Sequence, residues 1–260
     1  MTEVETIIVT GAAGHLGKAV ARWWAKPGMH MVLIDRDGYR LEQASAALAD
    51  SGAVVLPLAV NVAFPDKLKA ELAKLLPSLW TAPPSLVVAH ALSGKGDGAK
   101  AACLGELNYK SFQEVVDANL TSVVFTIEAL LPFMQRAGGG RIVLVSSTAG
   151  VSASPTAALS YSLSKAGVAA LPRLLAPQLA ASRVLINAVA PGKFANPDWP
   201  DDPERVKRYE ESVPLGRLAS ADEVAALIGF LGSAANTYVT GQTILQDGGR
   251  LSAMPVVGER

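Results

Sequence analysis

The chain alternates between short apolar runs and longer segments with helical spacing, and this alternation restricts the fold more than any other feature. The first run, 6–10, ends at Gly11 and leads into the segment 15–26, where apolar residues recur at helical spacing. Apolar runs that alternate with helices predict a parallel sheet covered by helices on both faces. We therefore expect the α/β class, with a parallel sheet of about seven strands flanked by helices.

The same pattern sets the expected boundaries. We expect strands at 6–11, 30–35, 53–60, 85–92, 141–147, 183–192 and 241–249. We expect helices at 15–26, 39–52, 65–77, 111–135, 158–180 and 221–234. Without repeats, low-complexity tracts or linkers, residues 1–260 read as one domain. The prolines and charges of segment 193–218 predict a mobile surface segment that covers the substrate. It follows the sixth strand, where open α/β sheets place their ligands.

Composition excludes several classes of function. The formal net charge is zero, so general affinity for nucleic acid or anionic membranes is not expected. Cys103 is the only cysteine, which rules out an internal disulfide and favours a reducing compartment. The N-terminal sequence carries acidic residues and leads directly into a strand, unlike a signal peptide. No run of about 18 uninterrupted apolar residues predicts a membrane span, so we expect a cytoplasmic protein.

A glycine turn between the first strand and the first helix predicts a phosphate site. Gly11, Gly14 and Gly17 are spaced G-x-x-G-x-x-G, where the commoner dinucleotide pattern is G-x-G-x-x-G. Glycines allow a diphosphate to approach the backbone closely, and a helix N-terminus offers free N–H groups and partial positive charge. A tight turn without a ligand would show the same glycines.

Asp35 ends the second strand and indicates which dinucleotide binds. A carboxylate there accepts hydrogen bonds from the adenosine ribose hydroxyls and repels a 2′-phosphate. No Arg or Lys lies in the loop 11–15 to attract that phosphate, and Arg36 is expected to lie along the adenine. We therefore expect NAD in preference to NADP. A carboxylate that only caps a turn would look the same in sequence.

Four motifs then occur in order: the glycine turn, Asn119 within a long helix, Ser146-Ser147 at the end of the fifth strand, and Tyr161 four residues before Lys165. Together with Pro191-Gly192 after the sixth strand, they resemble the short-chain dehydrogenase/reductase family over nearly the whole chain. The resemblance implies a single domain with a Rossmann-type doubly wound sheet. It also implies hydride transfer between a nicotinamide and an alcohol or carbonyl, and a homotetramer or homodimer. It implies no metal.

The resemblance also implies roles for individual residues. Tyr161 is the expected general acid/base, with Lys165 lowering its pKa and bonding the nicotinamide ribose. Ser147 is expected to hold the substrate oxygen, and Asn119 a water that supplies protons to the lysine. The expected cofactor-binding residues are Gly11, Gly14, His15, Leu16, Gly17, Asp35, Arg36, Asn61, Val62, Ala89, His90, Ala91, Tyr161, Lys165, Pro191, Gly192, Phe194 and Asn196.

The chain departs from the family pattern at four places. His15 stands where the family's second glycine is expected, and either touches a phosphate or caps the helix. Residues 89–92 read Ala-His-Ala-Leu in place of Asn-Asn-Ala-Gly, and His90 is interpreted as a structural hydrogen-bonding residue. Asn61 replaces an aspartate that faces adenine, and Asn196 replaces a threonine that faces the carboxamide.

Three functions remain open at this level. The leading one is an NAD(P)-dependent oxidoreductase acting on a secondary alcohol or ketone. The altered residues 89–92 leave room for a catalytically idle dinucleotide-binding sensor or scaffold. The glycine spacing leaves room for an epimerase or dehydratase that retains its NAD, although such enzymes usually carry a separate C-terminal substrate domain.

Overall fold

The structure is a computed structural model that describes residues 5–75, 84–88, 107–154, 156–197 and 201–252. Some residues that the sequence singles out lie outside these ranges. They are Ala89, His90, Ala91, Leu92, Cys103 and Trp199.

The described residues build one parallel sheet of seven strands in the order β3-β2-β1-β4-β5-β6-β7. The strands are β1 (Glu5–Thr10), β2 (Met29–Asp35), β3 (Val54–Ala59), β4 (Ser85–Val88), β5 (Gly140–Val145), β6 (Val184–Pro191) and β7 (Thr243–Gln246). The chain runs outward from β1 to β3 and then crosses to β4 on the other side of β1. This arrangement confirms the predicted fold class. Its strand order reverses between β1 and β4, where such sheets bind ligands at the carboxyl ends of their strands.

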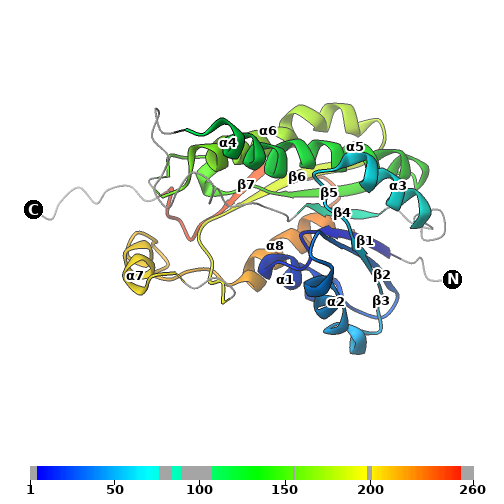
Figure 1. The fold of residues 1–260 in the computed structure, drawn as a ribbon, viewed down its shortest axis with the longest axis horizontal. Coiled ribbons are helices and arrows are strands. Elements are labelled where there is room, and N and C mark those ends of the chain that lie inside the picture. The colour runs from blue at the N-terminus through cyan, green and yellow to red at the C-terminus, as the bar shows by residue number, and fades with distance from the viewer. Residues whose placement is uncertain (1–4, 76–83, 89–106, 155, 198–200, 253–260) are drawn as a thin grey trace, which may run out of the picture.

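Helices cover both faces of the sheet (Figure 1). One face carries α1 (His15–Trp24), α2 (Gly38–Ala46) and α8 (Ala221–Gly232), and the other carries α3 (Pro65–Leu75), α4 (Tyr109–Val116), α5 (Ser122–Arg136) and α6 (Leu159–Ala180). Successive side chains of β1 serve opposite layers, because a strand turns alternate residues to opposite faces. Ile7 and Val9 pack in the core beneath α1 and α8, whereas Ile8 packs in the core beneath α5 and α6.

The expected long helix at 111–135 is interrupted in the middle. A π-helical turn, Asp117–Thr121, joins α4 to α5. A π-turn accommodates one extra residue in the helix and is frequent at functional sites. Asn119 lies in this turn and is completely buried.

Segment 193–218 contains a helix that the sequence analysis did not predict. Helix α7 (Pro203–Glu211) lies apart from both helical layers, at the left of Figure 1. The carboxylate of Asp202 accepts hydrogen bonds from the backbone N–H groups of Glu204 (2.8 Å) and Arg205 (3.2 Å). An aspartate cap followed by proline in the first turn is a typical helix start, and this signal was available in the sequence.

Within the described residues, one helical stretch, Tyr109–Arg136, is long and apolar enough to cross a membrane by length and composition, and 44% of its most apolar window is buried in the protein. A core helix of a water-soluble protein passes the same test.

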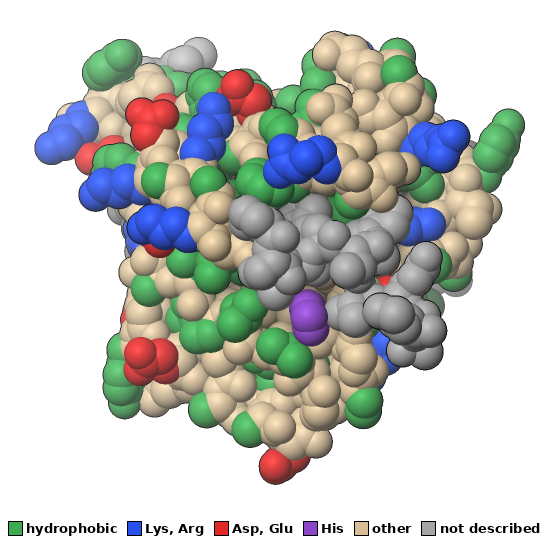
Figure 2. Space-filling view, turned by 90° about the vertical axis from the view of Figure 1, so that its right-hand side faces the viewer, with side chains coloured by type: hydrophobic (Ala, Val, Ile, Leu, Met, Phe, Trp, Pro, Cys, Tyr) green, Lys and Arg blue, Asp and Glu red, His purple; other side chains and the backbone are tan. Residues whose placement is uncertain are grey.

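The surface at the N-terminal end of β1 carries a mixture of basic, acidic and apolar side chains (Figure 2).

Candidate active site

The turn between β1 and α1 is built by glycines at two positions. Gly11 has a φ of +66°, in the left-handed region that a side chain disfavours. A β-carbon on Gly17 would lie 2.1 Å from the carbonyl oxygen of Gly11, so α1 can start this close to the turn only with glycine there. The amide of Gly14 closes the turn by donating to the Gly11 carbonyl at 3.0 Å.

The N-terminus of α1 suits an anion. The first N–H groups of a helix lack intrahelical partners, and they carry partial positive charge. The N-cap residue is Gly14, which has no side chain to cap them, and the first turn contains no acidic residue. A diphosphate is therefore the kind of group that this turn can hold.

Asp35 is fixed at the end of β2 by two backbone groups. Its carboxylate oxygens accept hydrogen bonds from Ala13 N–H and Asp37 N–H, both at 3.1 Å. The first of these bonds joins the carboxylate to the glycine turn. Asp35 thus stands beside the turn, where a ribose attached to a diphosphate would lie.

A cavity of about 310 Å³ runs along the carboxyl ends of β1, β2 and β3. It brings together many of the predicted cofactor residues: Gly11, Gly14, His15, Leu16, Gly17, Asp35, Arg36, Asn61, Val62, Phe194 and Asn196. It is also lined by four residues that the sequence analysis missed, Ile34, Val60, Ala63 and Ala118. Ile34, Val60 and Ala63 each lie next to a predicted cofactor residue at the end of a strand. That position was the only feature of the sequence that could have indicated them. The lining suits the adenosine and diphosphate half of a dinucleotide.

Asn61 is held in place by its own turn. Its side-chain oxygen accepts a hydrogen bond from Ala63 N–H at 3.0 Å. This turn keeps the residue at the cavity wall next to Val62.

Ser147 and Tyr161 meet at the end of β5. The Ser147 side chain lies close enough to the Tyr161 phenol to counteract part of the rise in its pKa. Ser147 also begins a short 3-10 turn and accepts a hydrogen bond from Ala149 N–H at 3.2 Å. Its neighbour Ser146 points the other way and donates to the backbone carbonyl of Lys165 at 2.7 Å. The structure therefore pairs Tyr161 with Ser147, as the alternation of side chains along a strand predicts.

Lys165 lies one turn after Tyr161 on α6 and is 1% exposed. Its ammonium donates to the carbonyl oxygen of Val145, the last residue of β5, at 2.8 Å. The nitrogen lies 5.9 Å from the centre of the Tyr161 ring. Gly150 permits this packing, because a β-carbon there would lie 2.4 Å from the Lys165 carbonyl carbon. The sequence analysis did not single out Gly150.

The pKa values of these groups correct one expectation. Burial raises the pKa of Tyr161, and its hydrogen bond with Ser147 opposes this shift. Burial lowers the pKa of Lys165 to about 8. We had expected the lysine charge to lower the tyrosine pKa. Desolvation is the largest influence on both groups, and it disfavours the charged form of each.

The chain after β6 reaches back to the cavity. Gly192 lies against the Tyr209 hydroxyl, which accepts a hydrogen bond from Lys193 N–H at 2.8 Å. Tyr209 therefore supports the backbone here. The Phe194 ring stacks on the His15 ring, with centroids 6.4 Å apart and planes 18° apart. For His15 the sequence analysis offered a phosphate contact or a helix cap, and this stack is a third arrangement.

The remaining predicted residues are distributed as follows. Tyr161, Lys165, Pro191 and Gly192 do not line the cavity, although the last two lead directly to Phe194 and Asn196. Asn119 follows Ala118, which does line it. Among the residues that the structure describes, no three His, Cys, Asp or Glu side chains gather as a metal site would require.

Known proteins match this chain along almost its whole length. The profile of a family described as enoyl-(acyl carrier protein) reductase matches residues 11–250. Cis-4-hydroxycyclohexanecarboxylate dehydrogenase of Sinomonas cyclohexanicum is 35% identical, over 93% of this chain and 94% of the relative.

Solved structures agree with these sequence matches. A 3-oxoacyl-[acyl-carrier protein] reductase with bound NAD from Brucella melitensis superposes with a TM-score of 0.85 at 29% identity, covering 95% of this chain and 91% of that one. L-sorbose reductase from Gluconobacter frateurii, complexed with NADPH and L-sorbose, gives a TM-score of 0.86 at 27% identity, covering 97% and 98%. The motifs, the sheet and these relatives together show that the chain belongs to the short-chain dehydrogenase/reductase family of NAD(P)-dependent oxidoreductases.

Proposed function

We propose that the protein interconverts a secondary alcohol and a ketone with NAD(H), and that Tyr161 is the general acid/base. The observation that carries this proposal is the grouping of Ser147, Tyr161 and a buried Lys165, whose ammonium is bonded to the end of β5 and lies 5.9 Å from the centre of the Tyr161 ring. A bound nicotinamide would supply the hydride acceptor for the alcohol carbon, or the hydride donor for the ketone carbon. The protein must then take up or supply the hydroxyl proton, and it must hold the oxygen in place meanwhile.

Each proposed role follows from position. The Tyr161 phenol exchanges the proton with the substrate oxygen. The Ser147 hydroxyl, already within hydrogen-bonding reach of that phenol, holds the same oxygen and stabilises its developing charge. Lys165 bonds the nicotinamide ribose and favours the phenolate when it is charged. Asn119, buried in the π-turn, is proposed to hold a water that supplies protons to the lysine.

The cofactor preference is proposed from Asp35. Its carboxylate lies beside the glycine turn and would accept hydrogen bonds from ribose hydroxyls, whereas a 2′-phosphate would meet its charge. The family contains both kinds of relative, since one of the matched structures holds NAD and another NADPH.

We further propose that the protein is cytoplasmic and assembles as a homotetramer or homodimer. Val124 and Phe125 of α5 and Leu163 and Leu174 of α6 are between 38% and 52% exposed, and apolar side chains on long helices suit contact with a second copy. Light scattering at micromolar concentration should give a mass above that of one chain, and a stable monomer would refute the assembly.

Tyr161→Phe should reduce turnover by about 10²–10⁴-fold or more, because general acid/base groups contribute this much and the phenol oxygen also contacts the substrate. The ring still packs, so the fold should survive. The assay is oxidation or reduction of the best substrate from a screen of alcohols and ketones, followed as NADH absorbance. Tyr238→Phe, at a side chain that is 95% exposed, is the matched control and should keep full activity.

Retention of more than about a tenth of turnover by Tyr161→Phe would exclude the tyrosine as acid/base. The same screen tests the alternatives. Dinucleotide binding with no turnover on any substrate would favour an idle sensor or scaffold. Tightly bound NAD that copurifies and is regenerated in each cycle would favour an epimerase or dehydratase.

Lys165→Met should change how stability depends on pH. The pKa of Lys165 is lowered to about 8, so between pH 8 and 10.5 the unfolded chain binds more protons than the folded one, and stability rises with pH. Relative to Lys165→Met, the wild type should gain about 1–2 kcal/mol of unfolding free energy between roughly pH 7.5 and 9.5. Urea unfolding measures it, and the exposed Lys110→Met is the control. If the unfolding free energy of wild type and of Lys165→Met depended on pH in the same way, the lowered pKa of Lys165 would be contradicted.

NAD⁺ should bind more tightly than NADP⁺, and Asp35→Ala should narrow the ratio of the two dissociation constants by about tenfold. The ratio is the informative quantity, because the substitution also removes the bond to Ala13 and loosens the turn for both cofactors. Calorimetry on the purified protein gives both constants, with the remote Asp50→Ala as control. Tighter binding of NADP⁺ by the wild type would overturn the assignment.

A further inference from the structure

The His15–Phe194 stack joins two parts of the chain across the sheet edge. His15 opens α1 beside β1, and Phe194 follows the end of β6, with β4 and β5 between those two strands. Both rings are partly exposed and both line the cavity. Their offset, nearly parallel geometry lies within the range of favourable aromatic pairs. The stack therefore spans the cleft at the glycine turn.

The backbone on both sides of Phe194 is anchored. Phe194 forms a parallel bridge with Ala219, and Ala195 N–H donates to the Ala219 carbonyl at 3.0 Å. On the other side, Lys193 N–H donates to the Tyr209 hydroxyl. The Phe194 ring therefore projects from a backbone held at two points.

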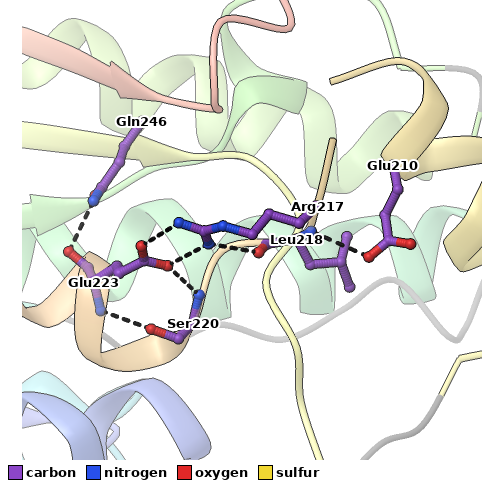
Figure 3. Close-up of polar contacts among 6 residues, drawn as sticks. All are labelled: Glu210, Arg217, Leu218, Ser220, Glu223 and Gln246. Atoms are coloured by element: carbon purple, nitrogen blue, oxygen red, sulfur yellow. Dashed lines mark hydrogen bonds and ion pairs between the residues drawn. The ribbon is translucent and has the colours of Figure 1, made fainter. Parts of the chain in front are cut away.

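Ala219 is itself fixed by a polar cluster at the start of α8 (Figure 3). Arg217 donates to both carboxylate oxygens of Glu223, at 2.9 and 2.7 Å. Ser220 and Glu223 cap the helix reciprocally, and Gln246 donates to the Glu223 carbonyl at 2.8 Å. Arg217 lowers the pKa of Glu223 to about 2, so the pair stays charged at any pH near neutrality. This base, defined by Arg217, Ser220, Glu223 and Gln246, supports the backbone next to Ala219, with which Phe194 forms its bridge.

We propose that His15 and Phe194 form an aromatic latch that closes the diphosphate part of the cleft and controls how fast the dinucleotide enters and leaves. The inference rests on the proposed function, because it assumes that a dinucleotide occupies this cavity. The structure shows the two rings stacked. Because the two rings must separate for the dinucleotide to pass in either direction, the latch slows entry and release by the same factor and leaves the dissociation constant unchanged.

The latch makes a kinetic prediction that a simple contact does not make. His15→Ala and Phe194→Leu should each raise the association and dissociation rate constants of NADH together, by about three- to tenfold, with the dissociation constant changed less than about twofold. The double variant should be no faster than either single variant, because one open side already opens the latch. His15→Phe retains a ring and should keep wild-type rates.

Stopped-flow fluorescence of NADH mixed with the full-length protein, and displacement by excess NAD⁺, give both constants. Phe230→Leu, at a partly exposed phenylalanine on the remote part of α8, is the matched control and should leave both unchanged. Circular dichroism checks that each variant is folded. Phe194→Leu preserves apolar bulk, so it serves if His15→Ala disturbs the turn.

The base of the latch is tested separately. Arg217→Met removes both bonds to Glu223 and should raise both rate constants in the wild-type background. It should have no further effect in the Phe194→Leu background, where the ring it positions is absent. An equal effect in both backgrounds would show that Arg217 acts on stability alone and would overturn its positioning role.

Other outcomes decide between the latch and a direct contact. A faster dissociation with unchanged association would show that the rings hold the ligand directly, and would overturn the latch. Multiplying effects in the double variant would overturn it too. Unchanged rates in variants of a wild type that binds NADH would overturn the latch alone. A wild type that binds neither NADH nor NADPH would overturn the proposed function and the latch with it.

Discussion

The junction between β5 and α6 is the contact on which the rest of the site depends. Lys165 donates its ammonium to the Val145 carbonyl, and Ser146 donates its hydroxyl to the Lys165 carbonyl. These two bonds run in opposite senses between α6 and the end of β5, one through the Lys165 side chain and one through its backbone. Burial makes them strong and makes an unpaired group costly. Tyr161, one turn earlier on the helix, is thereby held against Ser147.

The sheet followed from the sequence because its signal is local and repeated. Ile7, Ile8 and Val9 are all buried, yet they serve different cores, and a strand covered on both faces must read as an uninterrupted apolar run. The glycine turn could also be predicted, because its requirement is local. Gly17 lies so close to the Gly11 backbone that only glycine fits there.

The features that the sequence did not reveal depend on contacts between distant segments. The His15–Phe194 stack joins residues far apart in the chain, and neither residue signals the other. Gly150 is required only because Lys165 of another element lies against it. The direction of the Tyr161 pKa depends on how deeply the phenol is buried, which the spacing of Tyr161 and Lys165 cannot show. Helix α7 is a different case. The Asp-Pro pair that starts it is visible in the sequence, but the prolines and charges around it were interpreted as a mobile surface segment.

The π-turn at Asp117–Thr121 makes the relative rotation of α4 and α5 depend on the exact number of residues between them. One extra residue in a helix rotates everything before it by about 100° relative to everything after it. The apolar faces of α4 and α5 are therefore offset, and a single helical wheel drawn over both would not place their buried positions on one face. Deleting one residue here would restore a regular helix while turning α4 away from α6 and Asn119 out of the core. The buried asparagine thus occupies a place that depends on one inserted residue.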